Sequence, residues 1–526
     1  MRRWLITLGW ISCLILHAQS PPITHQPMDI PASMAGSFGE MRHHHFHSGI
    51  DLRSQGKIGQ VVRAMADGDL RRIVIKPGGF GWALYLEHPS GHTSVYAHLS
   101  EFKQAWMDHA MAYAKRNHRY VIDIPIAKGK FPIKAGDIIG LSGNSGGSGG
   151  PHLHVEWRDS QTEEPLNPLT YGLVVNDKVQ PVIRGLYAKS TEGAWQLHRP
   201  GKDNQLASEL IITSWQDLAL DVTDHMEYGG RPLGIQRITL QVGENMQTLH
   251  IQRFAFHQSR GVDALMHMDV QMKQGRRCYR IVPFASKDGQ QPADIWEGRG
   301  SLPTEGKHHF TLAVEDAHGN RSTLHGDVQF KPLTSARLIH DYRLPGSLQQ
   351  GNMKVSFSAH SFTHSPSLSL RKGDKHWQWT VSSTAPVLKP FTYTWTVSKE
   401  WTEPLDKTLL IVTDFRGNQS RLVGRVLTDG RLQFKSMQWG HMQLSVDTTA
   451  PTIRWIQRQG SLATLHLADN RLDIQSMTVT VNGQWVWAYH DAKNRRLLVS
   501  DLPESGELVV VAEDEAGNAT TFRHSF

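Results

Sequence analysis

Residues 149–156 read Gly-Gly-Pro-His-Leu-His-Val-Glu, a glycine-rich turn that leads into an alternating segment. In an extended strand, side chains two positions apart point to the same face, so His152 and His154 share one face about 6.5–7 Å apart. A His-x-His pair on a strand is either a metal-binding pair or simply a packed or surface pair. The choice between these depends on the segments around it.

Two other histidine segments precede this strand: Phe46-His47-Ser48-Gly49-Ile50-Asp51 and Ser94-Val95-Tyr96-Ala97-His98-Leu99. His47 and Asp51 are four residues apart with Gly49 between them, so a bend can aim both side chains at one point. Two imidazoles and one carboxylate form a zinc site with an open fourth position, the arrangement typical of catalytic zinc. The chain has only two cysteines, Cys13 and Cys278, which excludes a Cys₄ zinc ribbon and leaves nitrogen and oxygen ligands.

The residues around these segments predict an antiparallel β domain. Alternating or apolar runs separated by glycine- and proline-rich turns predict strands at residues 61–64, 68–75, 83–87, 93–98 and 120–126. Ser100 is a candidate N-cap for a helix that extends to about Arg116, with Phe102, Trp106, Ala110 and Tyr113 at helical spacing. We expect this helix to be an insertion packed on the sheet edge; shaping a substrate groove is the alternative.

These segments together resemble the M23 (LytM/lysostaphin-like) zinc metallopeptidases of bacterial cell walls. The resemblance covers about residues 36–172. It rests on the motifs Phe38-Gly39, His47-x-x-x-Asp51, Ala64-x-Ala66-Asp67-Gly68, Gly79-x-Gly81, Tyr96-Ala97-His98-Leu99, Ala135-Gly136-Asp137, Gly143-Asn144-Ser145-Gly146 and Pro151-His152-Leu153-His154. Residues 101–131 depart from the family, being longer than its usual connection.

The resemblance implies a compact antiparallel fold with one Zn²⁺ per chain, held by His47, Asp51 and His154. It also implies that His98 and His152 are catalytic and lie beside the metal-bound water. His45 is a further histidine that could lie near the site, whereas His43 and His44 are expected to be exposed. For Glu156 we expect a structural role rather than that of a general base.

The N-terminus has the pattern of a secretory signal. Arg2 and Arg3 precede the apolar run 4–16, and a cleavage site after Ala18 is plausible, so residues 1–18 are predicted to be removed. Lipidation at Cys13 is the alternative. The mature chain, beginning with a segment at 19–35, is expected in the periplasm or cell envelope, or secreted, with no membrane span. Its charge falls from +7 to +5 with loss of the two signal arginines, and without a Lys/Arg-rich stripe nucleic acid is not an expected partner.

The C-terminal two-thirds contains a motif that recurs about every 100 residues, Asp-x-x-Gly-Asn at Asp316, Asp414 and Asp514. Each copy lies between two strand-like segments and predicts a hairpin turn. We expect about three β-sandwich modules, at residues 178–332, 333–430 and 447–526, which resemble bacterial immunoglobulin-like domains. Calcium binding is the alternative role for the three aspartates, but a single copy of the motif lacks the spaced carboxylates that Ca²⁺ needs.

The overall prediction is a mainly β protein and an exported zinc metalloendopeptidase that hydrolyses peptide bonds of peptidoglycan stems or cross-links. The alternative is a non-catalytic regulator or scaffold of the same fold that activates another hydrolase. A third reading, in which the sandwiches bind polymers, has one small candidate surface. It comprises Trp485, Trp487 and Tyr489, for which core packing is the competing explanation.

Overall fold

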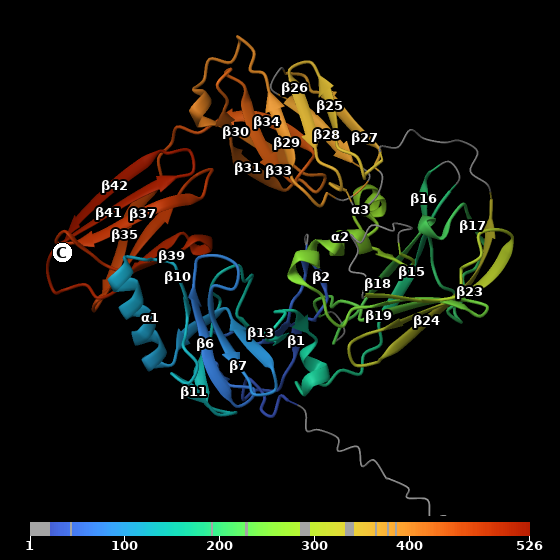
Figure 1. Ribbon diagram of the computed structural model, residues 1–526, viewed down its shortest axis with the longest axis horizontal. Helices are drawn as coiled ribbons and strands as arrows, with labels where there is room; N and C mark the ends of the chain where they lie inside the picture. The colour runs from blue at the N-terminus through green and yellow to red at the C-terminus, as the bar shows by residue number, and fades with distance from the viewer. Residues whose placement is uncertain are drawn as a thin grey trace, which may run out of the picture.

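The computed structural model describes residues 22–526 except 43–44, 191–192, 227–229, 284–294, 332–340, 363–365, 376–377, 384 and 386. The predicted signal segment with Cys13 and the residues His43 and His44 lie outside the described residues. The described chain is mainly β, as predicted, and forms four β units arranged one after another around a ring (Figure 1). Among the residues described, no helix has both the length and the apolar character needed to cross a bilayer.

The N-terminal domain is built on one large antiparallel sheet. Its strands run in the order β1 (Met34–Gly36), β4 (Ile50–Arg53), β13 (His152–Asp159), β8 (His92–Ala97), β7 (Trp82–Glu87), β6 (Gly68–Ile75) and β10 (Ile122–Pro125), with β11 (Pro132–Ile133) beside β6 and β14 (Pro165–Leu166) beside β13. A second sheet contains β5 (Val61–Arg63), β12 (Ile138–Ser142) and β9 (Leu99–Phe102), and β2 (Met41–Arg42) pairs with β3 (His45–Phe46). Strand β10 alternates between buried and exposed residues, whereas the central strands β7, β8 and β13 are buried on both faces.

The predicted helix exists but begins later than expected. Helix α1 spans Gln104–Asn117, and Lys103 is its N-cap. Ser100 is not the cap: it lies in β9, and its hydroxyl donates to the carbonyl of Ser142 at 2.9 Å. Pairing of β9 with β12 therefore overrides the capping signal. The helix buries Trp106, Ala110 and Ala114 against the domain.

Two sheets form each of the next three units. The first sandwich contains β15 (Val182–Lys189), β16 (Trp195–His198), β18 (Leu218–Thr223) and β21 (Tyr279–Arg280) in one sheet, and β17 (Leu210–Ile212), β19 (Arg237–Val242), β20 (Asn245–His250), β22 (Trp296–Arg299), β23 (Lys307–Glu315) and β24 (Arg321–Phe330) in the other. Two short helices, α2 (Val262–Leu265) and α3 (Met268–Gln274), precede β21.

The second sandwich pairs a sheet of β25 (Gly346–Gln350), β26 (Met353–Phe357), β29 (Phe391–Trp395), β33 (Leu432–Ser436) and β32 (Arg425–Val426) with one of β27 (Leu368–Lys372), β28 (Gln378–Ser383), β34 (His441–Val446), β30 (Thr408–Thr413) and β31 (Gln419–Val423). Its strands continue to Val446, past the end that we predicted at residue 430. Strand β33 pairs with β29 and β34 with β28, strands that come much earlier in the chain, and such long-range pairing leaves no local signal in the sequence.

The third sandwich pairs a sheet of β35 (Thr452–Gln459), β36 (Leu462–Ala468), β40 (Arg496–Val499) and β39 (Ala488–Asp491) with one of β38 (Gln484–Trp485), β37 (Ile474–Val481), β41 (Glu507–Asp514) and β42 (Ala519–Ser525). The three Asp-x-x-Gly-Asn motifs form the turns of the hairpins β23–β24, β30–β31 and β41–β42, as predicted. In each turn the glycine has a positive φ, between 75° and 85°, which only glycine adopts without strain.

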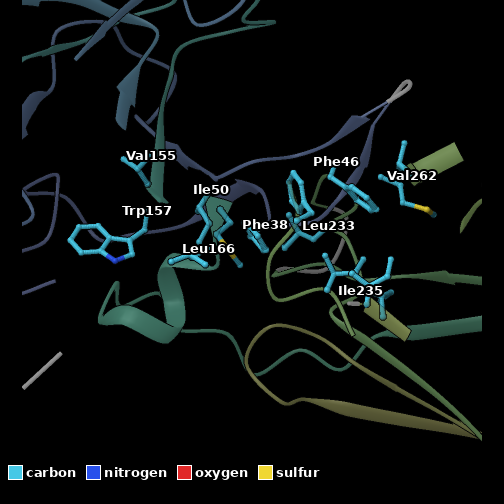
Figure 2. Close-up of a cluster of buried hydrophobic side chains, with 14 of the residues drawn as sticks. Phe38, Phe46, Ile50, Val155, Trp157, Leu166, Leu233, Ile235 and Val262 are labelled. Carbon is cyan, nitrogen blue, oxygen red and sulfur yellow. The ribbon is translucent and has the colours of Figure 1, made fainter. Parts of the chain in front are cut away.

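The first sandwich and the N-terminal domain share one hydrophobic core. Figure 2 shows this core passing from the site-bearing strands of the domain to the sandwich, through Trp157, Val155, Leu166, Ile50, Phe38, Phe46, Leu233, Ile235 and Val262. A polar contact reinforces it, because the backbone N–H of Gly234 donates to the Ser37 hydroxyl at 2.8 Å. The sandwich is therefore a direct support for the N-terminal domain.

The chain also turns back, so that the third sandwich packs on the N-terminal domain near α1 and β10 (Figure 1). Trp487 and Tyr489 are buried there, and the Trp82 ring lies 6.5 Å from Trp487 and 5.7 Å from Tyr489, centroid to centroid. Trp485 lies over Tyr120 at 5.0 Å. These aromatic residues do not share one strand, because β38 ends at Trp485 and β39 begins at Ala488. They form an interdomain contact rather than a polymer-binding face.

Candidate metal centre and active site

Three predicted ligands converge on the main sheet where β4 and β13 pair. Strand β13 pairs with β4 so that His154 lies opposite Asp51, and His47 lies just before β4, after the β2–β3 hairpin. Nε2 of His47 is 3.1 Å from Oδ1 of Asp51 and 3.0 Å from Nδ1 of His154. Nδ1 of His154 is 2.8 Å from the same Asp51 oxygen. Three potential ligand atoms thus meet within about the width of one ion.

The outer hydrogen bonds of the two imidazoles decide which nitrogen atoms face this point. Nδ1 of His47 donates to the carbonyl of Ser37 at 2.8 Å, so in the neutral ring its Nε2 carries a lone pair directed inward. Nε2 of His154 donates to Oε1 of Glu156 at 2.9 Å, which leaves Nδ1 on the inner side. Bonds of this kind from ligating histidines to carbonyl or carboxylate groups orient the rings for a metal. The donor set fits Zn²⁺, which accepts imidazole nitrogen and carboxylate oxygen.

The pKa values of the three residues in the metal-free protein are consistent with a cation-binding site. Burial lowers the pKa of His47 to about 4. Burial also lowers the pKa of His154, but hydrogen bonds and charge attraction from Asp51 and Glu156 outweigh it and raise that pKa to about 9. Although burial raises the pKa of Asp51, the surrounding imidazoles hold it well below its usual range. A proton on Nδ1 of His154 occupies the place that a cation would take, so metal binding there must release that proton.

The two predicted catalytic histidines lie beside the ligand cluster. His98, between β8 and β9, has its ring centroid 5.8 Å from that of His154 and 4.8 Å from that of His152. Nε2 of His152 is 3.4 Å from Oδ1 of Asp51. Both rings donate through Nδ1 to loop carbonyls, His98 to Ser145 at 2.9 Å and His152 to Gly150 at 2.8 Å. With Nδ1 as the donor, the second ring nitrogen, Nε2, is the one that remains for a further contact, and in His152 it faces the Asp51 carboxylate.

A buried charged network lies behind His154. Glu156 is fully buried, and its carboxylate accepts from His154, from the Ser48 hydroxyl, and from Arg158 Nε at 2.5 Å. Burial raises the pKa of Glu156, but the Arg158 charge and these bonds lower it to about 2. Glu156 thus accepts from three donors, one of which is the outer nitrogen of His154, and so orients that ring. Arg158 was not predicted, although the period of two along β13 places residues 152, 154, 156 and 158 on one face.

The hairpin residues ahead of His47 also contribute. Arg42, which sequence reasoning missed, contacts Oδ2 of Asp51 at 2.6 Å and so fixes the carboxylate oxygen that faces away from the histidines. His45 lies in β3 with an exposed side chain and is outside the group of three ligand atoms.

The loop 143–150 that holds His98 and His152 is itself held by the third sandwich. The ammonium of Lys493, in the turn after β39, donates to the carbonyl and the side-chain oxygen of Asn144, the latter at 2.9 Å. It also donates to the carbonyl of Ser148 at 3.0 Å. Ser148 in turn contacts Nδ1 of His152 through its hydroxyl at 3.1 Å. The C-terminal unit thus lies one residue away from a predicted catalytic side chain.

No protein-family model matches this chain. It is 33% identical over 134 residues to the DD-carboxypeptidase/endopeptidase Mpg of Neisseria meningitidis, covering 26% of this chain and 24% of that protein. It is 30% identical over 154 residues to an uncharacterized metalloprotease of Haemophilus influenzae, covering 28% and 26%. Among solved structures, the catalytic domain of the M23 protein EnpA from Enterococcus faecalis aligns at 24% identity with a TM-score of 0.21, covering 28% of this chain and 97% of that one. The matched stretch spans about a quarter of the length of the curated relatives. Over that stretch, the curated relatives confirm the resemblance to metallopeptidases predicted from the sequence.

Proposed function

We propose that this protein is an exported zinc metallopeptidase that hydrolyses peptide bonds of bacterial peptidoglycan. The observation that carries the proposal is the convergence of His47 Nε2, Asp51 Oδ1 and His154 Nδ1, each oriented by a second hydrogen bond or ion pair. Zn²⁺ held by these residues would supply Lewis-acid chemistry, which polarises a peptide carbonyl and lets water attack near neutral pH.

The chain's own residues would supply the proton transfers. His98 and His152 both hold a proton at Nδ1 against a loop carbonyl, so each has Nε2 available as an acceptor. Burial lowers the pKa of His98 to about 3, which keeps this imidazole neutral at physiological pH. A neutral imidazole accepts the proton of attacking water and, once protonated, donates it to the leaving amine.

The relatives support the proposed substrate class. One of them is named as a DD-carboxypeptidase/endopeptidase, and for this chain we propose peptidoglycan stems or cross-links as the substrate. Export is consistent with this substrate and with the signal-like N-terminus. The sandwich modules would position the N-terminal domain, since the first shares its core and the third contacts its loop.

The test compares three forms of the mature chain on purified sacculi: wild type, His47→Ala and His152→Ala. We expect the wild type to contain one zinc ion and to release muropeptides. His47→Ala should lose both zinc and activity, and His152→Ala should keep zinc and lose activity by at least about a hundredfold. Mass analysis of the products separates loss of a terminal D-Ala from cleavage of cross-links.

Two results would contradict the proposal. If His47→Ala retained full zinc content, the assigned ligands would be wrong. If the wild type held zinc, and neither it nor His152→Ala released muropeptides, a non-catalytic regulator would be the better interpretation.

A further inference from the structure

A second group of potential ligands, separate from the histidine centre, lies where the second sandwich meets the third. Asp447 is in the linker between β34 and β35, Asp469 follows β36, and Asp514 begins the Asp-x-x-Gly-Asn turn between β41 and β42. One carboxylate oxygen from each lies within 4.8 Å of the other two. Three separate segments of the chain therefore bring carboxylates to one place.

Two of these carboxylates have an oxygen atom with no hydrogen-bond partner. Asp447 is only 1% exposed; its Oδ1 accepts from the N–H of Thr449 at 3.1 Å, while its buried Oδ2 accepts from nothing. Asp469 accepts two backbone N–H groups at Oδ1, and its Oδ2 is likewise buried without a partner. A buried carboxylate oxygen without a donor is costly, and a bound cation removes that cost.

Nearby cations do not neutralise the cluster. The guanidinium of Arg471 donates to the Ser445 hydroxyl and the Val446 carbonyl, both at 2.7 Å. The Lys407 ammonium donates to the Ala516 carbonyl at 2.6 Å. Arg471 lowers the pKa of Asp447, but burial together with the charges of Asp469 and Asp514 leaves this pKa above its usual value. The site therefore retains an excess of negative charge.

The other two sandwiches show what is particular to this cluster. In the second sandwich Asp414 occupies the same turn, and Asn418 binds it as Asn518 binds Asp514, but Asp414 is outside the ligand groups found among the described residues. The first sandwich repeats the cluster with Asp177 and Asp316, but adds the imidazole of His318. Of the sandwich groups found among the described residues, the one in the third sandwich consists of oxygen ligands alone, the set that Ca²⁺ prefers.

We propose that Asp447, Asp469 and Asp514 bind one Ca²⁺ ion at the junction of the second and third sandwiches. The ion would connect the linker between β34 and β35 with the loop after β36 and the β41–β42 turn of the third sandwich. This position is next to the apolar contact of Leu409 with Leu472 and Ala516. Because the third sandwich also contacts the loop of the histidine centre, the ion would stabilise the position from which that contact is made. This inference does not depend on the proposed peptidase function.

The test uses the full mature chain, freed of metal by a chelator and then given one equivalent of Zn²⁺. Calorimetric titration with CaCl₂ and thermal unfolding with and without CaCl₂ are measured for the wild type, Asp469→Asn and the matched control Asp414→Asn. Asp469 is only partly buried, so its isosteric amide is expected to fold. We expect the wild type and Asp414→Asn to bind Ca²⁺ equally and to gain a few degrees in unfolding midpoint. In Asp469→Asn, one binding event should be lost or weakened at least tenfold.

Any Ca²⁺ bound by the first-sandwich cluster is the same in all three proteins. The difference in binding between Asp469→Asn and the wild type therefore reports only on the proposed site. Two results overturn the proposal, and the first requires no variant. One is a wild type that shows neither heat of binding nor a midpoint shift up to about 10 mM CaCl₂, beyond the usual range of extracellular calcium modules. The other is an Asp469→Asn variant that folds and binds Ca²⁺ as the wild type does.

Discussion

Glu156→Gln is the sharpest probe of the network behind the histidine centre. The substitution keeps the size of the side chain and removes its charge. An amide can still accept from Nε2 of His154 through its oxygen, but its NH₂ group would then face Nε of Arg158, donor against donor, where the carboxylate now accepts at 2.5 Å. Both Glu156 and Arg158 are buried, so water cannot replace the lost partner.

The size of the expected stability loss depends on which contacts Arg158 keeps in the variant. Removing one partner of a buried ion pair typically costs about 3–5 kcal/mol. Arg158 keeps Glu163 Oε2 at 3.1 Å and lies 4.6 Å from the Phe256 ring centroid, so we expect a loss in the unfolding free energy nearer to about 2–4 kcal/mol. Loss of a bond that orients a ligating histidine weakens metal binding about 10–100-fold.

The assay measures zinc affinity by competition with a chelator, and stability by denaturant unfolding, in Glu156→Gln and Glu163→Gln. Glu163 is the matched control because it binds the same arginine with a side chain that is 57% exposed. Its loss should cost no more than about 1 kcal/mol and leave zinc affinity unchanged. The reasoning is refuted if the two variants bind zinc equally well.

Three further substitutions test other parts of the molecule. Gly146 has a φ of +67°, and a Cβ there would lie 2.4 Å from Gly81 N, so Gly146→Ala should displace the carbonyl of Ser145 that holds His98. Activity should fall at least tenfold while zinc is retained. The control Gly149→Ala, whose Cβ meets nothing within 4 Å, should match the wild type in activity and in zinc content. Lys493→Met should lower muropeptide release and make the third sandwich more sensitive to limited proteolysis. The control Lys115→Met, which removes only the exposed ion pair with Asp501, should change neither property. If the two variants behaved alike, Lys493 would not support the loop 143–150. Burial and the charges of Asp316 and Asp177 raise the pKa of Asp224 to about 7 from 3.8, so the folded state binds this proton more tightly and loses stability as pH rises from about 4 to 7, by at most about 4 kcal/mol. Asp224→Asn should therefore unfold at a higher temperature than the wild type at pH 8, and by a clearly smaller margin at pH 5. The same margin at both pH values would contradict this.

Local patterns were sufficient for much of the fold, and together with the family resemblance they led to the proposed ligands. Alternation alone located the strand that carries His152 and His154, and the spacing of His47 and Asp51 anticipated a bend that aims both at one point. The Asp-x-x-Gly-Asn turns were equally predictable, because a positive φ at glycine is a property of a few consecutive residues. Strand faces and tight turns depend on neighbours in the chain, so the amino-acid order reveals them.

Long-range packing decided the rest. Ser100 has the residue type of a helix cap, yet it is a strand residue because β12, about forty positions later, pairs with its segment. Lys493 and the aromatic residues around Trp487 acquire their roles only where the last sandwich returns to the first domain. Asp447, Asp469 and Asp514 look like ordinary loop aspartates until three distant segments are folded against one another. Burial, shared charge and an oxygen left without a donor belong to the assembled structure, since each depends on groups that the chain brings together only through its tertiary contacts.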